Sequence, residues 1–129
     1  MGFSNFAVAV RINTPDGKIV VVEEPSKPAP IYKKFPSGGS ENNETPEEAA
    51  AREVEEETGL IFLPGQFRLI TIVQKRGHKL HFFEVDTDDL GDLKKIGDEG
   101  EIISIADRGV MFSNSFLPPQ RKMCMEVYG

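Results

Sequence analysis

The chain has 129 residues, a net charge of −6, 39% hydrophobic residues and 28% charged residues. This length fits one domain that buries its own core, and we expect residues 1–129 to form it. The composition is typical of a soluble globular protein, and the excess of acidic residues argues against a general nucleic-acid-binding surface, which needs clustered Lys and Arg.

The sequence carries no signal that is typical of a membrane protein or a secreted protein. No apolar stretch approaches the length of a membrane span, and the first residues lack the basic residues and long apolar run of a signal peptide. The single cysteine, Cys124, excludes an internal disulfide. We therefore expect a cytoplasmic protein in which Cys124 packs on a C-terminal helix.

Strand and turn signals fill the first part of the chain. Phe6 to Ile12 and Ile19 to Val22 are apolar runs separated by a Thr-Pro-Asp-Gly turn, which predicts a β-hairpin. After a proline-rich loop, Ile31 to Phe35 predicts a short strand that leads into Pro36-Ser37-Gly38-Gly39.

The next segment carries the signals of an α-helix. Thr45 is a good N-cap, Pro46 suits the first helical position, and Glu48 completes a capping box with Thr45. Gly59 provides a C-terminal stop, so the helix is predicted to run to about Thr58.

Strands are again favoured in the rest of the chain, with one helix at the end. Phe67 to Gln74 and Leu80 to Val85 predict a second hairpin that turns near Gly77, and Glu101 to Ala106 predicts a further strand. Two prolines open a helix from residue 118 to about residue 127. Strands on both sides of a central helix favour an α+β or mixed α/β fold.

The predicted central helix carries three glutamates on one face. Successive helical residues lie about 100° apart, which puts Glu53, Glu56 and Glu57 on one stripe. Like charges repel one another, and a hard cation such as Mg²⁺ or Mn²⁺ removes that cost because it prefers carboxylate oxygens. The stripe therefore predicts a metal site, with a solvated acidic helix face as the alternative.

Two neighbouring features suit such a site. Arg52 precedes the stripe, and its planar guanidinium can hold a carboxylate through two hydrogen bonds. Gly38 and Gly39 let the backbone turn tightly and approach a ligand, with a carbonyl oxygen as a candidate metal ligand. At a diphosphate, a divalent ion neutralises phosphate charge, acidifies an attacking water and orients the leaving group.

The segment from Gly38 to Leu60, GGSENNETPEEAAAREVEEETGL, resembles the box of the Nudix hydrolase family in its MutT-like form. The family pattern is G-x5-E-x7-R-E-U-x-E-E-x-G-U, in which U is a bulky aliphatic residue. Every specified position matches, and the matching residues are Gly38, Glu44, Arg52, Glu53, Val54, Glu56, Glu57, Gly59 and Leu60. The match falls in the predicted loop-helix-loop context.

The resemblance implies an α/β fold, a Nudix-type α/β/α sandwich around a mixed β-sheet. It also implies hydrolysis, dependent on Mg²⁺ or Mn²⁺, of a pyrophosphate bond in a nucleoside triphosphate or a related nucleoside-diphosphate-linked compound. By the same resemblance, Glu53, Glu56 and Glu57 are metal ligands. Arg52 and Glu44 orient them. Family members are often homodimers, so a homodimer is compatible with the resemblance.

Several residues are candidates for the general base. In the family, this base is either a glutamate of the box or an acid on a distant loop. Glu53 is the box candidate. Glu99 and Glu101 are the loop candidates, because they precede the last predicted strand as in MutT-type members.

The substrate class is open among several branches of the family. Pro36-Ser37-Gly38-Gly39 resembles dinucleoside-polyphosphate, inositol-polyphosphate and RNA 5′-pyrophosphate hydrolases. Markers of other branches are missing. ADP-ribose members tend to carry a proline near residue 75, but residues 74–78 contain none, and NADH-type members carry a Trp-containing signature, but the chain has no Trp. Gly77 stands where dinucleoside-polyphosphate members carry a tyrosine. Glu23-Glu24 occupies the place where many members have basic residues after the second strand, which counts against a standard phosphate grip there.

The densest basic cluster is Lys75-Arg76-Gly77-His78-Lys79, at a predicted hairpin tip. Arg76 and Lys79 are candidate contacts to substrate phosphates or to a 5′-phosphorylated RNA end, with a solvated hairpin tip as the alternative.

The alternative to an enzyme is a catalytically silent Nudix module that binds nucleotides. The intact glutamate set argues against it, since a binding-only module does not need every metal ligand.

Overall fold

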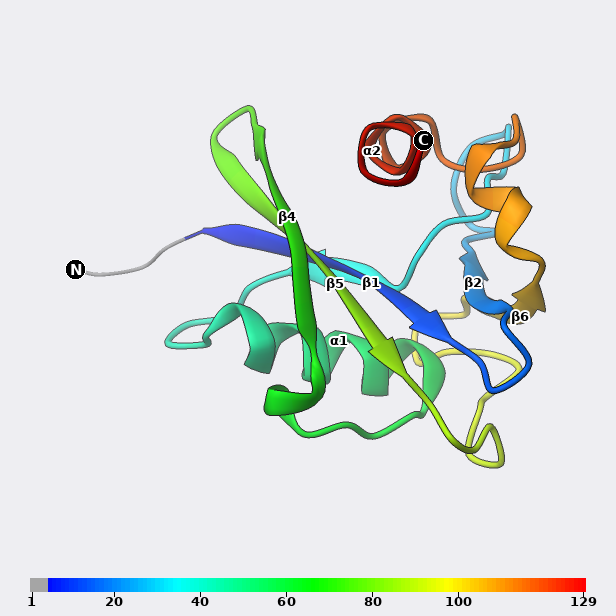
Figure 1. Cartoon of the computed structure of the whole chain (residues 1–129), viewed down its shortest axis with the longest axis horizontal. Coiled ribbons are helices and arrows are strands. Elements are labelled where there is room, and N and C mark those ends of the chain that lie inside the picture. Colours follow the sequence, from blue (N-terminus) through cyan, green and yellow to red (C-terminus); the bar gives the residue numbers. More distant parts are fainter. Residues whose placement is uncertain (1–4) are drawn as a thin grey trace.

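The computed structural model describes residues 5–129, which form a mixed six-stranded β-sheet with a helix on each face (Figure 1). The strands are β1 (Phe6–Asn13), β2 (Ile19–Glu23), β3 (Ser37–Gly39), β4 (Arg68–Lys75), β5 (His78–Asp86) and β6 (Ile102–Ala106). The helices are α1 (Pro46–Thr58) and α2 (Pro118–Tyr128), with short 3-10 helices η1 (Pro64–Gln66) and η2 (Arg108–Phe112). This arrangement is the predicted α/β/α sandwich.

The sheet runs in the order β4-β5-β1-β2-β6, with β3 also paired to β1. β1 pairs in parallel with β5 along its whole length, and the other strand pairs are antiparallel. The opposite edge of β1 is shared, because residues 7–9 pair with β3 and Asn13 pairs with Ile19 of β2. β3 therefore pairs with the first half of β1, and β2 pairs only with its last residue.

Two apolar cores lie on the two faces of the sheet. On one face, Val8 and Val10 of β1 pack with Ala50 and Val54 of α1. On the other face, Ala9 packs in a core that includes three phenylalanines and residues of α2, namely Phe35, Phe82, Phe116, Met123 and Cys124. Cys124 is fully buried, as expected. Neither helix in the described range has the length and apolar character needed to cross a membrane.

Helix α1 begins and ends where its capping residues predict. The side chain of Thr45 accepts a hydrogen bond from the backbone N–H of Glu48, and the Glu48 side chain accepts from the Thr45 N–H, at 3.1 and 2.9 Å. Gly59 ends the helix with φ of 80°, a conformation that favours glycine. The caps thereby fix the ends of α1, while the packing of Ala50 and Val54 on the sheet decides which of its faces is buried.

The predicted strand at Ile31 to Phe35 is wrong. Lys33 and Lys34 make only isolated bridges, and the strand forms instead at Ser37–Gly39, against β1. Pro36 lacks a backbone N–H and interrupts a continuous ladder. Two glycines have low strand propensity, so the short strand that follows Pro36 gives no local signal.

Candidate active site

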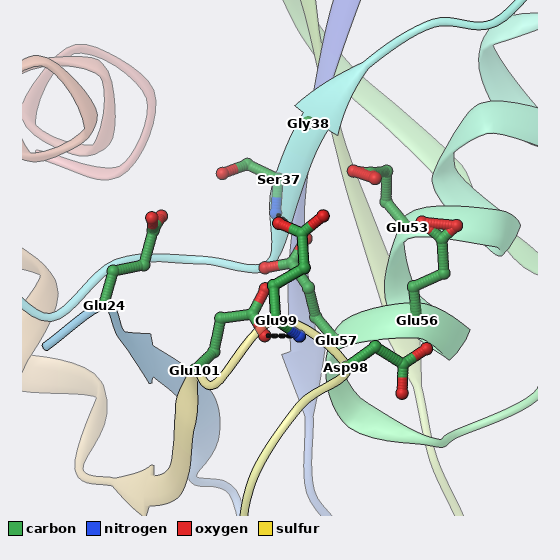
Figure 2. A pocket seen from close by; sticks show the side chains of 9 residues that line it. All are labelled: Glu24, Ser37, Gly38, Glu53, Glu56, Glu57, Asp98, Glu99 and Glu101. Atoms are coloured by element: carbon green, nitrogen blue, oxygen red, sulfur yellow. Dashed lines mark hydrogen bonds between the residues drawn. The ribbon is translucent and has the colours of Figure 1, made fainter. Parts of the chain in front are cut away.

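A pocket of about 530 Å³ is lined by residues of α1, β3 and the segment that precedes β6 (Figure 2). Besides Ser37 and Gly38, its described lining is entirely acidic, and consists of Glu24, Glu53, Glu56, Glu57, Asp98, Glu99 and Glu101. We call this site the acidic pocket. Among the described residues, no Lys, Arg or His lines it.

Helix α1 supplies three of these carboxylates from one stripe. Glu57 is the most buried of them, 6% exposed, and its Oε2 accepts a hydrogen bond from the Ser37 backbone N–H at 3.2 Å. Glu53 is partly buried, whereas the Glu56 side chain is 43% exposed. The stripe thus extends from the interior toward solvent.

Gly38 allows β3 to pass close to α1. A Cβ atom at this position would collide with the carboxylate of Glu53. A side chain at this position would therefore displace the Glu53 carboxylate from the place it occupies in the pocket.

Hydrogen bonds tie the segment before β6 to the C-terminal part of α1. The backbone N–H of Lys94 donates to the Thr58 carbonyl at 2.8 Å, and that of Asp98 donates to the Glu56 carbonyl at 3.3 Å. The Oε1 of Glu101 accepts from the Glu99 N–H at 3.0 Å. These bonds bring Glu101, which is 8% exposed, and the exposed Glu99 to the pocket.

Arg52 lies next to the pocket and binds several of its acids. Its Nε and Nη2 donate to the two carboxylate oxygens of Glu44 at 2.6 and 3.0 Å, a bidentate pair. Its Nη1 donates to Glu53 at 3.1 Å and to Glu56 at 3.2 Å. Its Nη2 also donates to the Gly39 carbonyl at 2.9 Å. One guanidinium therefore links β3, the loop before α1 and the glutamate stripe.

Burial raises the pKa of two carboxyl groups on α1, so they ionise less readily than usual. It raises the pKa of Glu53 to about 7, with Glu56 and Glu99 adding to the effect against the opposing charge of Arg52. Burial also raises the pKa of Glu57 to about 8, and the charge of Glu53 contributes. By contrast, the hydrogen bond from Arg52 holds the pKa of Glu44 below its ordinary value. The protein thus supplies too little positive charge and too few donors to hold Glu53 and Glu57 as full anions.

The donor chemistry of the pocket fits a hard divalent cation, because carboxylates are the ligands that Mg²⁺ and Mn²⁺ prefer. Within residues 5–129, however, no three His, Cys, Asp or Glu side chains form a group arranged to hold one ion. Glu53 and Glu56 are hydrogen-bonded to Arg52, and Glu57 to the Ser37 backbone. Ion binding would therefore require these side chains to turn toward a common point.

The remaining candidate residues are divided between the pocket and other places. Gly38, Glu99 and Glu101 line the pocket, whereas the Gly39 carbonyl is occupied by Arg52. Arg76 and Lys79 lie at the β4–β5 hairpin and do not line it.

Glu24, Ser37 and Asp98 line the pocket but were not predicted as site residues. Ser37 directly precedes the box, whereas Glu24 and Asp98 come from other segments, and local patterns do not show where such segments meet.

The family assignment follows from the whole chain as well as from the box. Residues 4–118 match the family model described as NUDIX domain. The chain belongs to the Nudix family. No curated protein matches it at the sequence level. The chain is accordingly a pyrophosphohydrolase, and Nudix hydrolases act on nucleoside-diphosphate-linked compounds and are generally dependent on divalent metals.

Solved structures agree with the Nudix fold. A structure from work on MutT of Aliivibrio salmonicida and Vibrio cholerae has a TM-score of 0.79 and 22% identity, covering 97% of each chain. A NUDIX hydrolase from Nitrosomonas europaea has a TM-score of 0.70 and 26% identity, covering 98% of this chain and 88% of the other. The T. brucei MERS1-RNA complex has a TM-score of 0.59 and 17% identity, covering 75% of this chain and 38% of the other.

Proposed function

We propose that this Nudix hydrolase cleaves a pyrophosphate bond in a nucleoside triphosphate or a related compound, with Mg²⁺ or Mn²⁺ bound by Glu53, Glu56 and Glu57. The observation that carries the proposal is the acidic lining of the pocket, in which seven carboxylates gather and no described basic side chain takes part. A phosphate-bearing substrate is repelled by such a pocket unless divalent cations bridge the two sets of negative charge.

Arg52 acts as a positioning residue in this proposal. A bound divalent cation would neutralise the phosphate oxygens and acidify the attacking water. Arg52 holds the stripe through Glu53 and Glu56, and Glu44 fixes Arg52 in turn through its bidentate pair. The two glutamates are thereby kept at the edge of the pocket, from which a bound cation would turn them toward a common point.

Glu99 is the favoured general base. The carboxylate of Glu53 is occupied by Arg52, and that of Glu101 accepts the Glu99 N–H. Glu99 is exposed and lines the pocket, and no hydrogen bond to its carboxylate is present in the described residues. A base must be free to accept a proton from water, which favours Glu99 over the other two.

A nucleotide panel tests the proposed function. The chain is incubated with Mg²⁺ and, in parallel, with a chelator. The panel contains nucleoside triphosphates, dinucleoside polyphosphates and 5′-triphosphorylated RNA, and phosphate, pyrophosphate and nucleotide products are measured. We expect pyrophosphate and a nucleoside monophosphate from triphosphates, and no products with chelator. Tight nucleotide binding without turnover of any substrate would instead indicate a silent binding module.

A longer substrate is the second candidate, and it is supported by a fold neighbour that was solved with RNA. Arg76 and Lys79 at the β4–β5 hairpin are the proposed contacts to its phosphates. Replacing both with Ala should then raise KM for 5′-triphosphorylated RNA more than for nucleoside triphosphates, and should flatten the salt dependence of RNA binding. Equal small effects on both substrates would assign these residues to a solvated hairpin tip.

A further inference from the structure

A second cavity, of about 410 Å³, adjoins the acidic pocket and is lined mainly by apolar side chains. We call it the loop pocket, and its walls include Pro28, Ile31, Tyr32 and Leu117. Glu24 lines both cavities. A ligand whose charged end lies in the acidic pocket can therefore extend past Glu24 into an apolar and aromatic environment.

Backbone hydrogen bonds hold the walls of the loop pocket in place. Val22 and Lys34 exchange two of them, at 2.8 and 2.9 Å, so the end of the loop is fixed to β2. The backbone N–H of Leu117 donates to the Lys33 carbonyl at 2.8 Å. Tyr32 therefore precedes a segment that is anchored on both sides, and the pocket needs little ordering before it binds a ligand.

Positive charge lies at the junction of the two cavities. Lys34 forms an ion pair with Glu24, and the Lys27 Nζ lies 3.7 Å from a carboxylate oxygen of Glu24. The Lys34 side chain is only 18% exposed. β2 ends at Glu23, and the loop that follows brings both lysines to the neighbouring Glu24.

We propose that the loop pocket binds the nucleobase of the substrate against the Tyr32 ring, while Lys34 contacts the phosphate nearest the sugar. This inference rests on the proposed function, because it extends a diphosphate in the acidic pocket toward its nucleoside. A nucleotide presents charged phosphates, then a sugar, then a flat aromatic base. The acidic pocket, the lysines and the aromatic wall follow in the same order.

Other described cavities lack this continuity. One lies between β4 and α2 and is lined by Val73 and Lys122, and another is lined by His78 and His81. Neither shares a lining residue with the acidic pocket. A base in either cavity would have no described wall in common with the phosphate site.

Kinetics on matched substrates test the role of Tyr32. The best nucleoside triphosphate of the panel is compared with ribose 5-triphosphate, which carries a sugar and a 5-triphosphate but no base. Since stacking of one base contributes about a tenfold change or more in affinity, Tyr32→Ala should raise KM for the nucleotide about tenfold with little change in kcat. Tyr32→Phe keeps the ring and should rescue most of the KM that Tyr32→Ala loses. The unchanged control is Phe112→Ala, a partly exposed aromatic outside the described pockets.

The result that would overturn the inference is an equal change in KM for both substrates, or no change for the nucleotide. A double variant separates the roles of Lys34. If Lys34 contacts phosphate, the rise in KM caused by Lys34→Gln persists when Glu24→Gln is added. If Lys34 only neutralises Glu24, the second substitution restores KM, and the phosphate contact is rejected.

Binding of nucleoside 5′-monophosphates separates this inference from the proposed function, because it needs no turnover. Amide NMR shifts are followed while each of the four common ribonucleoside monophosphates is added with Mg²⁺. We expect shifts at Tyr32 and Leu117. These shifts without hydrolysis of any panel member would support the subsite and reject the enzymatic proposal. Shifts confined to Val73 and Lys122, or no shifts with any monophosphate, would overturn the subsite whatever the turnover.

Discussion

Two groups of carboxylates in this protein have opposite surroundings. In the acidic pocket, seven acids line one cavity without a basic residue in its described lining. On the α2 side of the sheet, Glu84 and Asp86 belong to what we call the paired cluster, in which each carboxylate has its own donors. Asn13 donates to both at 2.9 Å, Arg68 donates to Asp86 at 3.0 Å, and the Tyr128 hydroxyl donates to Glu84 at 2.6 Å.

The difference shows that the placement of donors, more than residue type, decides what a glutamate does. The hydrogen bond from Arg68 holds the pKa of Asp86 below its ordinary value, whereas burial without enough donors raises the pKa of Glu57 to about 8. The paired cluster therefore stabilises the fold by itself. The acidic pocket holds repulsion that a bound cation would relieve, and this makes it suited to a ligand.

The largest expected effect comes from removing one charge of the stripe. Glu56→Gln should lower turnover by more than the roughly 10–100-fold typical for loss of an outer partner of a metal site, because a ligand itself is lost. Without metal, the melting temperature should hold or rise slightly, since like-charge repulsion is relieved. Turnover and thermal unfolding in chelator are the measurements.

Glu55→Gln is the matched control for this stripe variant. Glu55 lies on the same helix, but it is exposed and does not line the pocket. We expect its turnover to equal that of the wild type. Full activity of Glu56→Gln with unchanged metal dependence would refute the metal-site assignment.

Arg52→Lys should have the next largest effect. The variant keeps the positive charge but loses the planar fork that binds Glu44, Glu53 and Glu56 together. We expect kcat to fall roughly 10–100-fold, as for other residues that orient metal ligands, with a smaller change in KM. Arg68→Lys in the paired cluster is the control, and its kcat should be unaffected. Comparable kcat values for Arg52→Lys and wild type would limit Arg52 to a charge effect.

Stability of the metal-free protein should fall as the pH rises from about 4.5 to about 8. The pKa values of Glu53 and Glu57 are raised from 4.5 to about 7 and about 8. In that window, the folded state keeps protons that the unfolded chain releases, so raising the pH favours unfolding. The lowered pKa of Asp86 acts at the other end, since its stabilisation is lost as the pH falls through acid values.

Thermal unfolding in chelator across this pH range measures the effect. Adding Mg²⁺ at pH 8 should restore the melting temperature, because the ion replaces the missing protons. A Glu53→Gln, Glu57→Gln double variant should show a flatter profile than the wild type. A wild-type melting temperature that rises between pH 5 and 8 in chelator would show that these carboxylates are compensated.

Helix α1 and its charges could be read from the sequence because their determinants are local. Thr45 and Gly59 mark its ends, and the helical period alone places Glu53, Glu56 and Glu57 on one face. The other walls of the pocket were not predictable. Glu24 and Asp98 reach it only through long-range pairing and loop anchoring, which leave no periodic signal.

The sequence also did not show how deeply each glutamate of the stripe is buried. The stripe predicts three equivalent carboxylates, but Glu57 is buried and Glu56 is partly exposed, because β3 covers one end of the stripe. The parallel pairing of β1 with β5 also escaped prediction, since the two strands are far apart in the chain. Contacts of this kind depend on the whole sheet and not on any one segment.

The smallest effect on activity is expected where the paired cluster is broken. Tyr128→Phe removes the hydroxyl that donates to Glu84, and loss of a hydrogen bond to a charged group costs about 1.5 kcal/mol of unfolding free energy. Turnover should not change, since Tyr128 does not line the acidic pocket. Denaturant unfolding and steady-state kinetics measure the two quantities.

Tyr32→Phe is the matched control, because Tyr32 is the one other tyrosine in the chain and the same hydroxyl is removed. Within residues 5–129, no hydrogen bond of the Tyr32 hydroxyl is present, so its removal should leave the free energy of unfolding unchanged. If Tyr128→Phe lowered turnover as strongly as Arg52→Lys, the paired cluster would be coupled to catalysis. The contrast between a carboxylate group that stabilises the fold and one reserved for a cation would then be wrong.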